Sequence, residues 1–118
     1  MSMNITIREN NGITVIDLSG RLTLGDAPAI LREDIRRLLD EGKTRLLLNL
    51  AGLTFLDSAG MGLLVGAYAT VSRSGGQLKM SNLTSRVKDL LIITKLYTVF
   101  EIFDDEASAV ASFTAAVR

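Results

Sequence analysis

Hydrophobic and polar residues alternate in two short segments at the start of the chain. Ile5 and Ile7 have polar neighbours, which is typical of an edge strand, and residues 13–18 form a second, more apolar run. Asn10-Asn11-Gly12 lies between the two segments and is a turn signal. The pattern predicts a β-hairpin whose second strand ends at Ser19-Gly20.

A period of 3.6 residues replaces this alternation between Asp26 and Glu41, which predicts an amphipathic helix. Asp26 is suited to cap its start, and Gly42 is suited to end it. The charged residues lie mostly on the opposite face, as on any solvated helix surface. The apolar stripe expected to face the core comprises Ala27, Ile30, Leu31, Ile35, Leu38 and Leu39.

Strands and helices continue to alternate along the rest of the chain. The apolar run Arg45–Leu50 predicts a central strand covered on both faces, which Ala51-Gly52 is expected to break. The segments that follow are a helix from Asp57-Ser58 to about Ser72, a strand near 78–80, a helix capped by Thr84, a short strand at Val99–Phe103, and a helix after Asp104-Asp105-Glu106 anchored by Val110 and Phe113.

The order of these elements is β-β-α-β-α-β-α-β-α. Because helices separate most of the strands, the fold class is α/β, with helices packed against a mixed sheet of four to five strands. The antiparallel part of that sheet comes from the first hairpin. We expect residues 1–118 to form one domain with about four helices.

Composition limits the chemistry that the chain can perform. It has 118 residues, with 13 basic and 13 acidic side chains, so charge gives no reason to expect nucleic acid or an acidic membrane as a partner. The absence of cysteine and histidine excludes disulfides, thiolate zinc sites and histidine-based catalysis. No metal or cofactor is expected. Residues 1–11 lack a signal-peptide pattern, and the longest apolar stretch, 61–71, is too short to span a bilayer, so we expect a cytoplasmic protein.

The segment 53–66 is the most informative part of the sequence. A buried strand leads into a helix that begins at Asp57 or Ser58, both of which are good capping residues. The backbone N–H groups of a first helical turn lack partners and favour an anion. Position alone favours Ser58 as a helix cap, and the alternative is a hydroxyl group that is modified.

Gly60, Gly62 and Gly66 lie inside this predicted helix, where each costs about 1 kcal/mol relative to alanine. Such glycines indicate either close packing against another backbone or a surface that a partner approaches closely. Packing within the fold would explain Gly62 or Gly66 more readily than Gly60. The glycine spacing does not match a dinucleotide-binding loop, and no lysine follows as in a phosphate-binding loop.

The segment Asp57-Ser58-Ala59-Gly60-Met61-Gly62 resembles the phosphorylation-site signature of anti-sigma factor antagonists, which belong to the larger class of STAS domains. The similarity extends over nearly the whole chain. It includes the opening hairpin, Gly20-Arg21-Leu22, Gly75-Gly76, and the apolar positions between Val87 and Phe100.

The resemblance implies a non-enzymatic protein that changes partners. In that family, an anti-sigma factor with serine-kinase activity phosphorylates the serine that follows the motif aspartate, which is Ser58 here. The unphosphorylated antagonist binds the anti-sigma factor and releases the sigma factor; phosphorylation breaks this complex, and a phosphatase restores it. The family fold implies a partner-binding surface formed by Thr23, Leu24, Gly25, Asp26, Asp57, Ser58, Ala59, Gly60 and Met61. For Met61, a place in the core is an equal alternative.

The sequence departs from the family pattern at two positions. Thr23 stands where an acidic residue is frequent, which affects the charge expected near the serine. Ala59 stands where a second hydroxyl residue is common, so Ser58 is the only hydroxyl in the four-residue motif.

Three other functions remain open. Ser58 could form a catalytic pair with Lys79, Lys88 or Lys95, although no spacing favours any of these lysines. The chain could instead be a scaffold or interaction module of a stress-signalling assembly whose partner is not an anti-sigma factor. The cytoplasmic domain of a transporter is less expected, because the chain begins with Met1 and contains no membrane segment.

Overall fold

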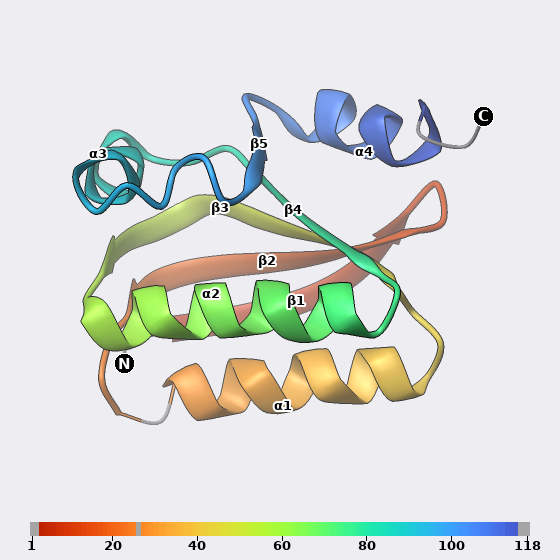
Figure 1. Ribbon diagram of the computed structural model, residues 1–118, viewed down its shortest axis with the longest axis horizontal. Helices are drawn as coiled ribbons and strands as arrows, with labels where there is room; N and C mark the ends of the chain where they lie inside the picture. Colours follow the sequence, from red (N-terminus) through yellow and green to blue (C-terminus); the bar gives the residue numbers. More distant parts are fainter. Residues whose placement is uncertain (1–2, 26, 116–118) are drawn as a thin grey trace.

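The computed structural model describes residues 3–25 and 27–115, which fold around one five-stranded sheet (Figure 1). The predicted fold class and element order are confirmed. In chain order the elements are β1 (Met3–Asn10), β2 (Ile13–Leu22), α1 (Ala27–Asp40), β3 (Arg45–Leu56), α2 (Ser58–Arg73), β4 (Gln77–Ser81), α3 (Ser85–Ile93), β5 (Glu101–Phe103) and α4 (Glu106–Ala115).

The strands lie in the sheet in the same order as in the chain, β1-β2-β3-β4-β5. β1 and β2 are antiparallel and form the predicted hairpin, with Asn11 and Gly12 at positive φ in the turn. The other three pairings are parallel. The carboxyl ends of β2, β3 and β4 therefore lie at the same edge of the sheet, where the connections to α1, α2 and α3 begin.

Helices cover both faces of the sheet. α1 and α2 pack side by side on one face, and α4 lies on the other (Figure 1). Alternation along β3 shows the division, because Leu46 and Leu48 face the larger core with α1 and α2, whereas Leu47 joins the smaller core under α4. The predicted anchors Val110 and Phe113 are both buried in this smaller core.

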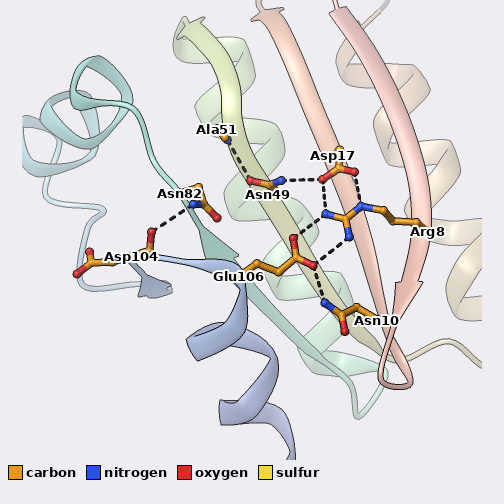
Figure 2. A network of polar contacts seen from close by, with 8 residues as sticks. All are labelled: Arg8, Asn10, Asp17, Asn49, Ala51, Asn82, Asp104 and Glu106. Atoms are coloured by element: carbon orange, nitrogen blue, oxygen red, sulfur yellow. Dashed lines mark hydrogen bonds and ion pairs between the residues drawn. The ribbon is translucent and has the colours of Figure 1, made fainter.

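Polar contacts also attach α4 to the sheet. Arg8 on β1 donates hydrogen bonds to Asp17 on β2 at 2.6 Å and to Glu106 at the start of α4 at 2.6 Å (Figure 2). Asn10 donates to Glu106 at 2.6 Å. Hydrogen bonds from Arg8 are the main reason that the pKa values of Asp17 and Glu106 lie below their ordinary values. The last helix is thus held to the first strand by charge as well as by apolar packing.

Two predictions about the strands were wrong. β2 continues beyond Ser19-Gly20 to Leu22, and β3 continues through Ala51 and Gly52 to Leu56. The strands remain paired because the register shifts twice, between Asp17 and Ser19 and between Gly20 and Arg21. Glycine is needed at position 52 because a Cβ atom there would lie 2.7 Å from the Cβ of Ser19.

The structure confirms the predicted helices, with smaller differences. α1 buries Leu31, Ile35 and Leu38 as expected, but Ile30 is 52% exposed because it lies at the edge of the stripe. Asp26, the predicted cap of this helix, lies outside the described residues. The last strand starts at Glu101 rather than Val99. No helix within residues 3–25 and 27–115 has the length and hydrophobicity needed to cross a membrane.

Candidate functional site

The ends of β2 and β3 bring two connections into contact. Leu22 and Leu56 are Cα partners in the last rung of the parallel ladder. Beyond this rung, the amide of Asp57 donates to the carbonyl oxygen of Leu22 at 3.3 Å, and the amide of Leu24 donates to Asp57 Oδ2 at 2.8 Å. The segments 23–25 and 57–61 therefore adjoin, which the sequence alone did not show.

Asp57 caps helix α2. It has extended backbone angles, φ −105° and ψ −169°, and its Oδ1 accepts a hydrogen bond from the amide of Gly60 at 2.9 Å. Its two carboxylate oxygens thus serve different purposes, one at the helix start and one at the β2–α1 connection. The hydrogen bonds from the amides of Leu24 and Gly60 lower the pKa of Asp57 below its ordinary value.

Ser58 is the first residue of α2, so the interpretation of Ser58 as the helix cap was wrong. Its side chain is exposed, and among the described residues its hydroxyl has no hydrogen-bond partner. The positive end of the helix dipole lies at this position. The hydroxyl of Ser58 is thus accessible where an added negative charge is tolerated.

Of the three glycines in α2, Gly60 is the one that the fold requires, contrary to the expectation from the sequence. A Cβ atom at this position would collide with the carbonyl oxygen of Leu22 and would lie 3.1 Å from the Cβ of Leu56. Gly62 and Gly66 face open space. The start of α2 therefore lies directly against the end of β2, and this close approach fixes the position of Ser58.

The other residues predicted for partner binding lie around Ser58 to different extents. Leu24 is 83% exposed, Gly25 is exposed with φ 138°, and Thr23 is half-buried. Met61 is half-buried and packs against the larger core, and Ala59 is half-buried. We call residues 23–25 and 57–61 the Ser58 surface; Asp26, predicted to belong to it, lies outside the described residues.

Two of the three lysines considered for a serine–lysine pair have partners other than Ser58. Lys79 is buried and its Nζ contacts Ser112 Oγ at 2.9 Å and Glu101 at 3.1 Å, on the α4 side of the sheet. Lys88 lies over the ring of Tyr97. Among the described residues, no group of three or more acidic side chains could hold a metal ion.

Sequence reasoning missed one cluster at this edge of the sheet. Phe55 on β3 has the guanidinium carbons of Arg21 and Arg86 at 4.9 and 5.8 Å from its ring centroid. The two register shifts between β2 and β3 determine which residues face each other, and no local pattern in the sequence indicates them. Of the three residues, only Arg21 was indicated by the sequence, because Gly20-Arg21-Leu22 is part of the family resemblance.

The sheet topology and a comparison with family models together define the class of this protein. The family model of the STAS domain matches residues 4–109, and the chain belongs to the STAS domain family. Within the family it is similar to the anti-sigma-B factor antagonist of Bacillus subtilis, with 31% identity over 102 residues that cover 86% of this chain and 92% of that protein. The anti-sigma F factor antagonist of Paenibacillus polymyxa is 27% identical over 114 residues, which cover 92% of this chain and 93% of that protein.

Solved structures agree on the fold. The anti-sigma factor antagonist SpoIIAA in its unphosphorylated form superposes with a TM-score of 0.80 at 22% identity, covering 98% of this chain and 100% of that one. The phosphorylated form of SpoIIAA, described as a Bacillus cell fate determinant, gives a TM-score of 0.72 at 21% identity, covering 93% and 99% of the two chains.

Proposed function

We propose that this chain is an anti-sigma factor antagonist and acts by binding rather than by catalysis. Its unphosphorylated form binds a serine-kinase anti-sigma factor through the Ser58 surface and thereby releases a sigma factor in the cytoplasm. Phosphorylation of Ser58 breaks this complex, and a phosphatase restores it. The names of the relatives in Bacillus subtilis and Paenibacillus polymyxa support the proposal at the level of the partner class.

The observation that carries the proposal is the exposed hydroxyl of Ser58 next to the carboxylate of Asp57. A phosphate there would add about 1.5 to 2 negative charges at neutral pH. Because the site is a helix start on the surface, the fold can hold that charge. A partner surface that matched a small neutral side chain would instead face a hydrated dianion beside a second carboxylate, and an unpaired charge at an interface costs several kcal/mol.

The first test is to purify the protein from its native cells with bound partners retained and to map phosphorylation by peptide mass spectrometry. We expect phosphate on Ser58, and a kinase-like anti-sigma factor recovered mainly with the unmodified form. Phosphate elsewhere, or a stable partner indifferent to the state of Ser58, would contradict the proposal. The latter result would favour a scaffold or interaction module of a signalling assembly.

A second test uses purified components. The recovered anti-sigma factor is titrated with the unmodified chain and with the chain quantitatively phosphorylated on Ser58, and we expect binding to be lost on phosphorylation. Ala107→Asp is a matched control for added charge, since Ala107 is exposed in the first turn of α4, on the opposite side of the sheet. Binding that survives full phosphorylation of Ser58 would overturn the switch.

A further inference from the structure

Two arginines and one aromatic ring form a compact cluster next to the Ser58 surface. Arg21 and Phe55 are Cα partners in the β2–β3 ladder, and Arg86 reaches the same ring from α3. We call Arg21, Phe55 and Arg86 the arginine cluster. The next rung of the ladder toward the carboxyl edge carries Leu22 and Leu56, which lead directly into the Ser58 surface.

The cluster is built by three elements and does not depend on a loop. Leu22 and Leu56 are buried in the larger core under α1 and α2, so alternation places Arg21 and Phe55 on the other face of the sheet. The third member, Arg86, is positioned by the start of α3. There Thr84 Oγ1 donates to the carbonyl oxygen of Leu53 at 3.0 Å and ties the helix to β3.

The positive charges of the cluster have no carboxylate partner in the part of the chain that the structure describes. Several other cations have a carboxylate within ion-pair distance, whereas among the described residues neither Arg21 nor Arg86 has one. Two like charges on one ring repel each other, and each arginine–ring contact at an exposed site is worth only about 0.5–1 kcal/mol. An anion bound by both guanidinium groups would relieve the repulsion. The cations that do have a carboxylate partner include Arg8, Arg37, Lys43 and Lys79.

The shape of the site favours a carboxylate presented by a protein. Both guanidinium groups lie near the ring of Phe55, and among the described residues neither donates a side-chain hydrogen bond, so their N–H groups are available for the paired hydrogen bonds that a carboxylate accepts. Both arginines are exposed, and Phe55 and Leu24 add apolar surface nearby. Arginine and aromatic side chains together are typical of protein–protein interfaces.

We propose that the arginine cluster binds an acidic side chain of the same anti-sigma partner that contacts the Ser58 surface. This inference rests on the proposed function and extends it to a second contact. A negative charge of the partner would then lie near the end of β3, close to the β3–α2 connection that leads to Ser58. A phosphate on Ser58 would then repel that carboxylate. This repulsion would add to the loss of the contact that unmodified Ser58 makes with the partner.

The test compares the wild-type chain with the double variant R21Q/R86Q in binding to the recovered anti-sigma factor. We expect the double variant to bind about tenfold or more weakly and to show a weaker dependence on salt, because a charged pair has been removed. Arg73→Gln is the matched control, since Arg73 is exposed in the last turn of α2, away from the sheet edge where the cluster lies. Thermal unfolding of all three proteins checks that each is folded.

The outcomes separate the two proposals. Wild-type affinity and salt dependence in the folded double variant would overturn the arginine cluster as a contact and leave the antagonist function standing. A wild-type chain that binds no anti-sigma factor would overturn both. Loss of affinity in R21Q/R86Q with no loss in Arg73→Gln, and Nε–H resonances of Arg21 and Arg86 that shift when the partner is added, would support the proposal.

Discussion

The amide of Leu24 donates a hydrogen bond at 2.8 Å to the carboxylate of Asp57, which lies 33 positions later in the chain. The same carboxylate accepts from the amide of Gly60 in the first turn of α2. One side chain therefore holds the β2–α1 connection against the start of α2. This link maintains the shape of the Ser58 surface, so a substitution at Asp57 should change the conformation and hydrogen bonding of Leu24.

Two substitutions at Asp57 should distinguish its hydrogen bond with Leu24 from its hydrogen bond with Gly60. Asp57→Ala removes both acceptors, so we expect faster hydrogen exchange at the amides of Leu24 and Gly60. Asp57→Asn keeps one good acceptor, and because asparagine is a strong N-cap we expect protection of Gly60 to persist while that of Leu24 is lost. Amide exchange followed by NMR measures both positions. Unchanged exchange at Leu24 in Asp57→Ala would mean that this contact does not hold the connection.

Alanine at two neighbouring glycines should have opposite effects. Gly60→Ala forces a Cβ atom against the carbonyl of Leu22, and we expect the free energy of unfolding to fall by about 1–3 kcal/mol. Gly62→Ala meets open space inside a helix and should raise it by about 0.4–1 kcal/mol. Urea unfolding of the two variants is the measurement. Equal effects of the two substitutions would contradict the packing described for Gly60.

A negative charge at position 58 should leave the fold intact. Ser58→Asp places that charge at the start of α2, where the dipole favours it by about 0.3–1 kcal/mol. Ser85→Asp is a matched control, because Ser85 is also exposed and is the first residue of a helix capped by the residue before it. We expect both variants to unfold at or slightly above the wild-type midpoint. A clear loss of stability in Ser58→Asp alone would point to a switch that acts on folding.

The contacts of Arg8 should make stability depend on pH in the acid range. The pKa values of Asp17 and Glu106 are lower in the folded chain than in the unfolded chain, mainly because Arg8 donates to both. Their contribution is therefore complete above their ordinary pKa values, near pH 4, and is lost as pH falls through the lower folded values. Arg8→Gln should be less stable than wild type at pH 7.

The test of this dependence is urea unfolding of wild type and Arg8→Gln from pH 7 to pH 3. The difference between the two stability curves should shrink toward pH 3, because the stabilisation that Arg8 gives to the ionised forms of Asp17 and Glu106 is lost progressively below their ordinary pKa values. Other carboxyl groups titrate in both proteins and cancel in the difference. A constant difference across the whole range would contradict this role for Arg8.

Local patterns in the sequence predicted the elements of the fold but not their detailed contacts. The alternation at Ile5 and Ile7 and the helical stripe of Leu31, Ile35 and Leu38 are properties of short segments, and the structure confirms them. The continuation of β3 through Gly52 depends on the approach of Ser19 from another strand. No pattern within either segment contains that information.

For the site as well, local patterns predicted some residues, whereas contacts between elements determined the rest. Asp57 and Ser58 were candidates because polar residues stood at a predicted helix start, and the segment 57–62 matched a family signature. The importance of Gly60 over Gly62 depends on a carbonyl oxygen of β2, which only the packed structure brings close. No local pattern indicates Arg86, because its neighbour Phe55 lies on a different element.

The order of the strands has a consequence for how the chain assembles. Every strand pairs with the strand next to it in sequence, so each pairing closes a loop no longer than one hairpin turn or one helical crossover. Strand pairings between neighbours in sequence can form in order, from the first hairpin onward, as the chain leaves the ribosome. The bond between Arg8 and Glu106 spans 98 positions and can form only after α4 emerges. We expect this contact to form last and to convert a nearly complete sheet into the fully cooperative unit.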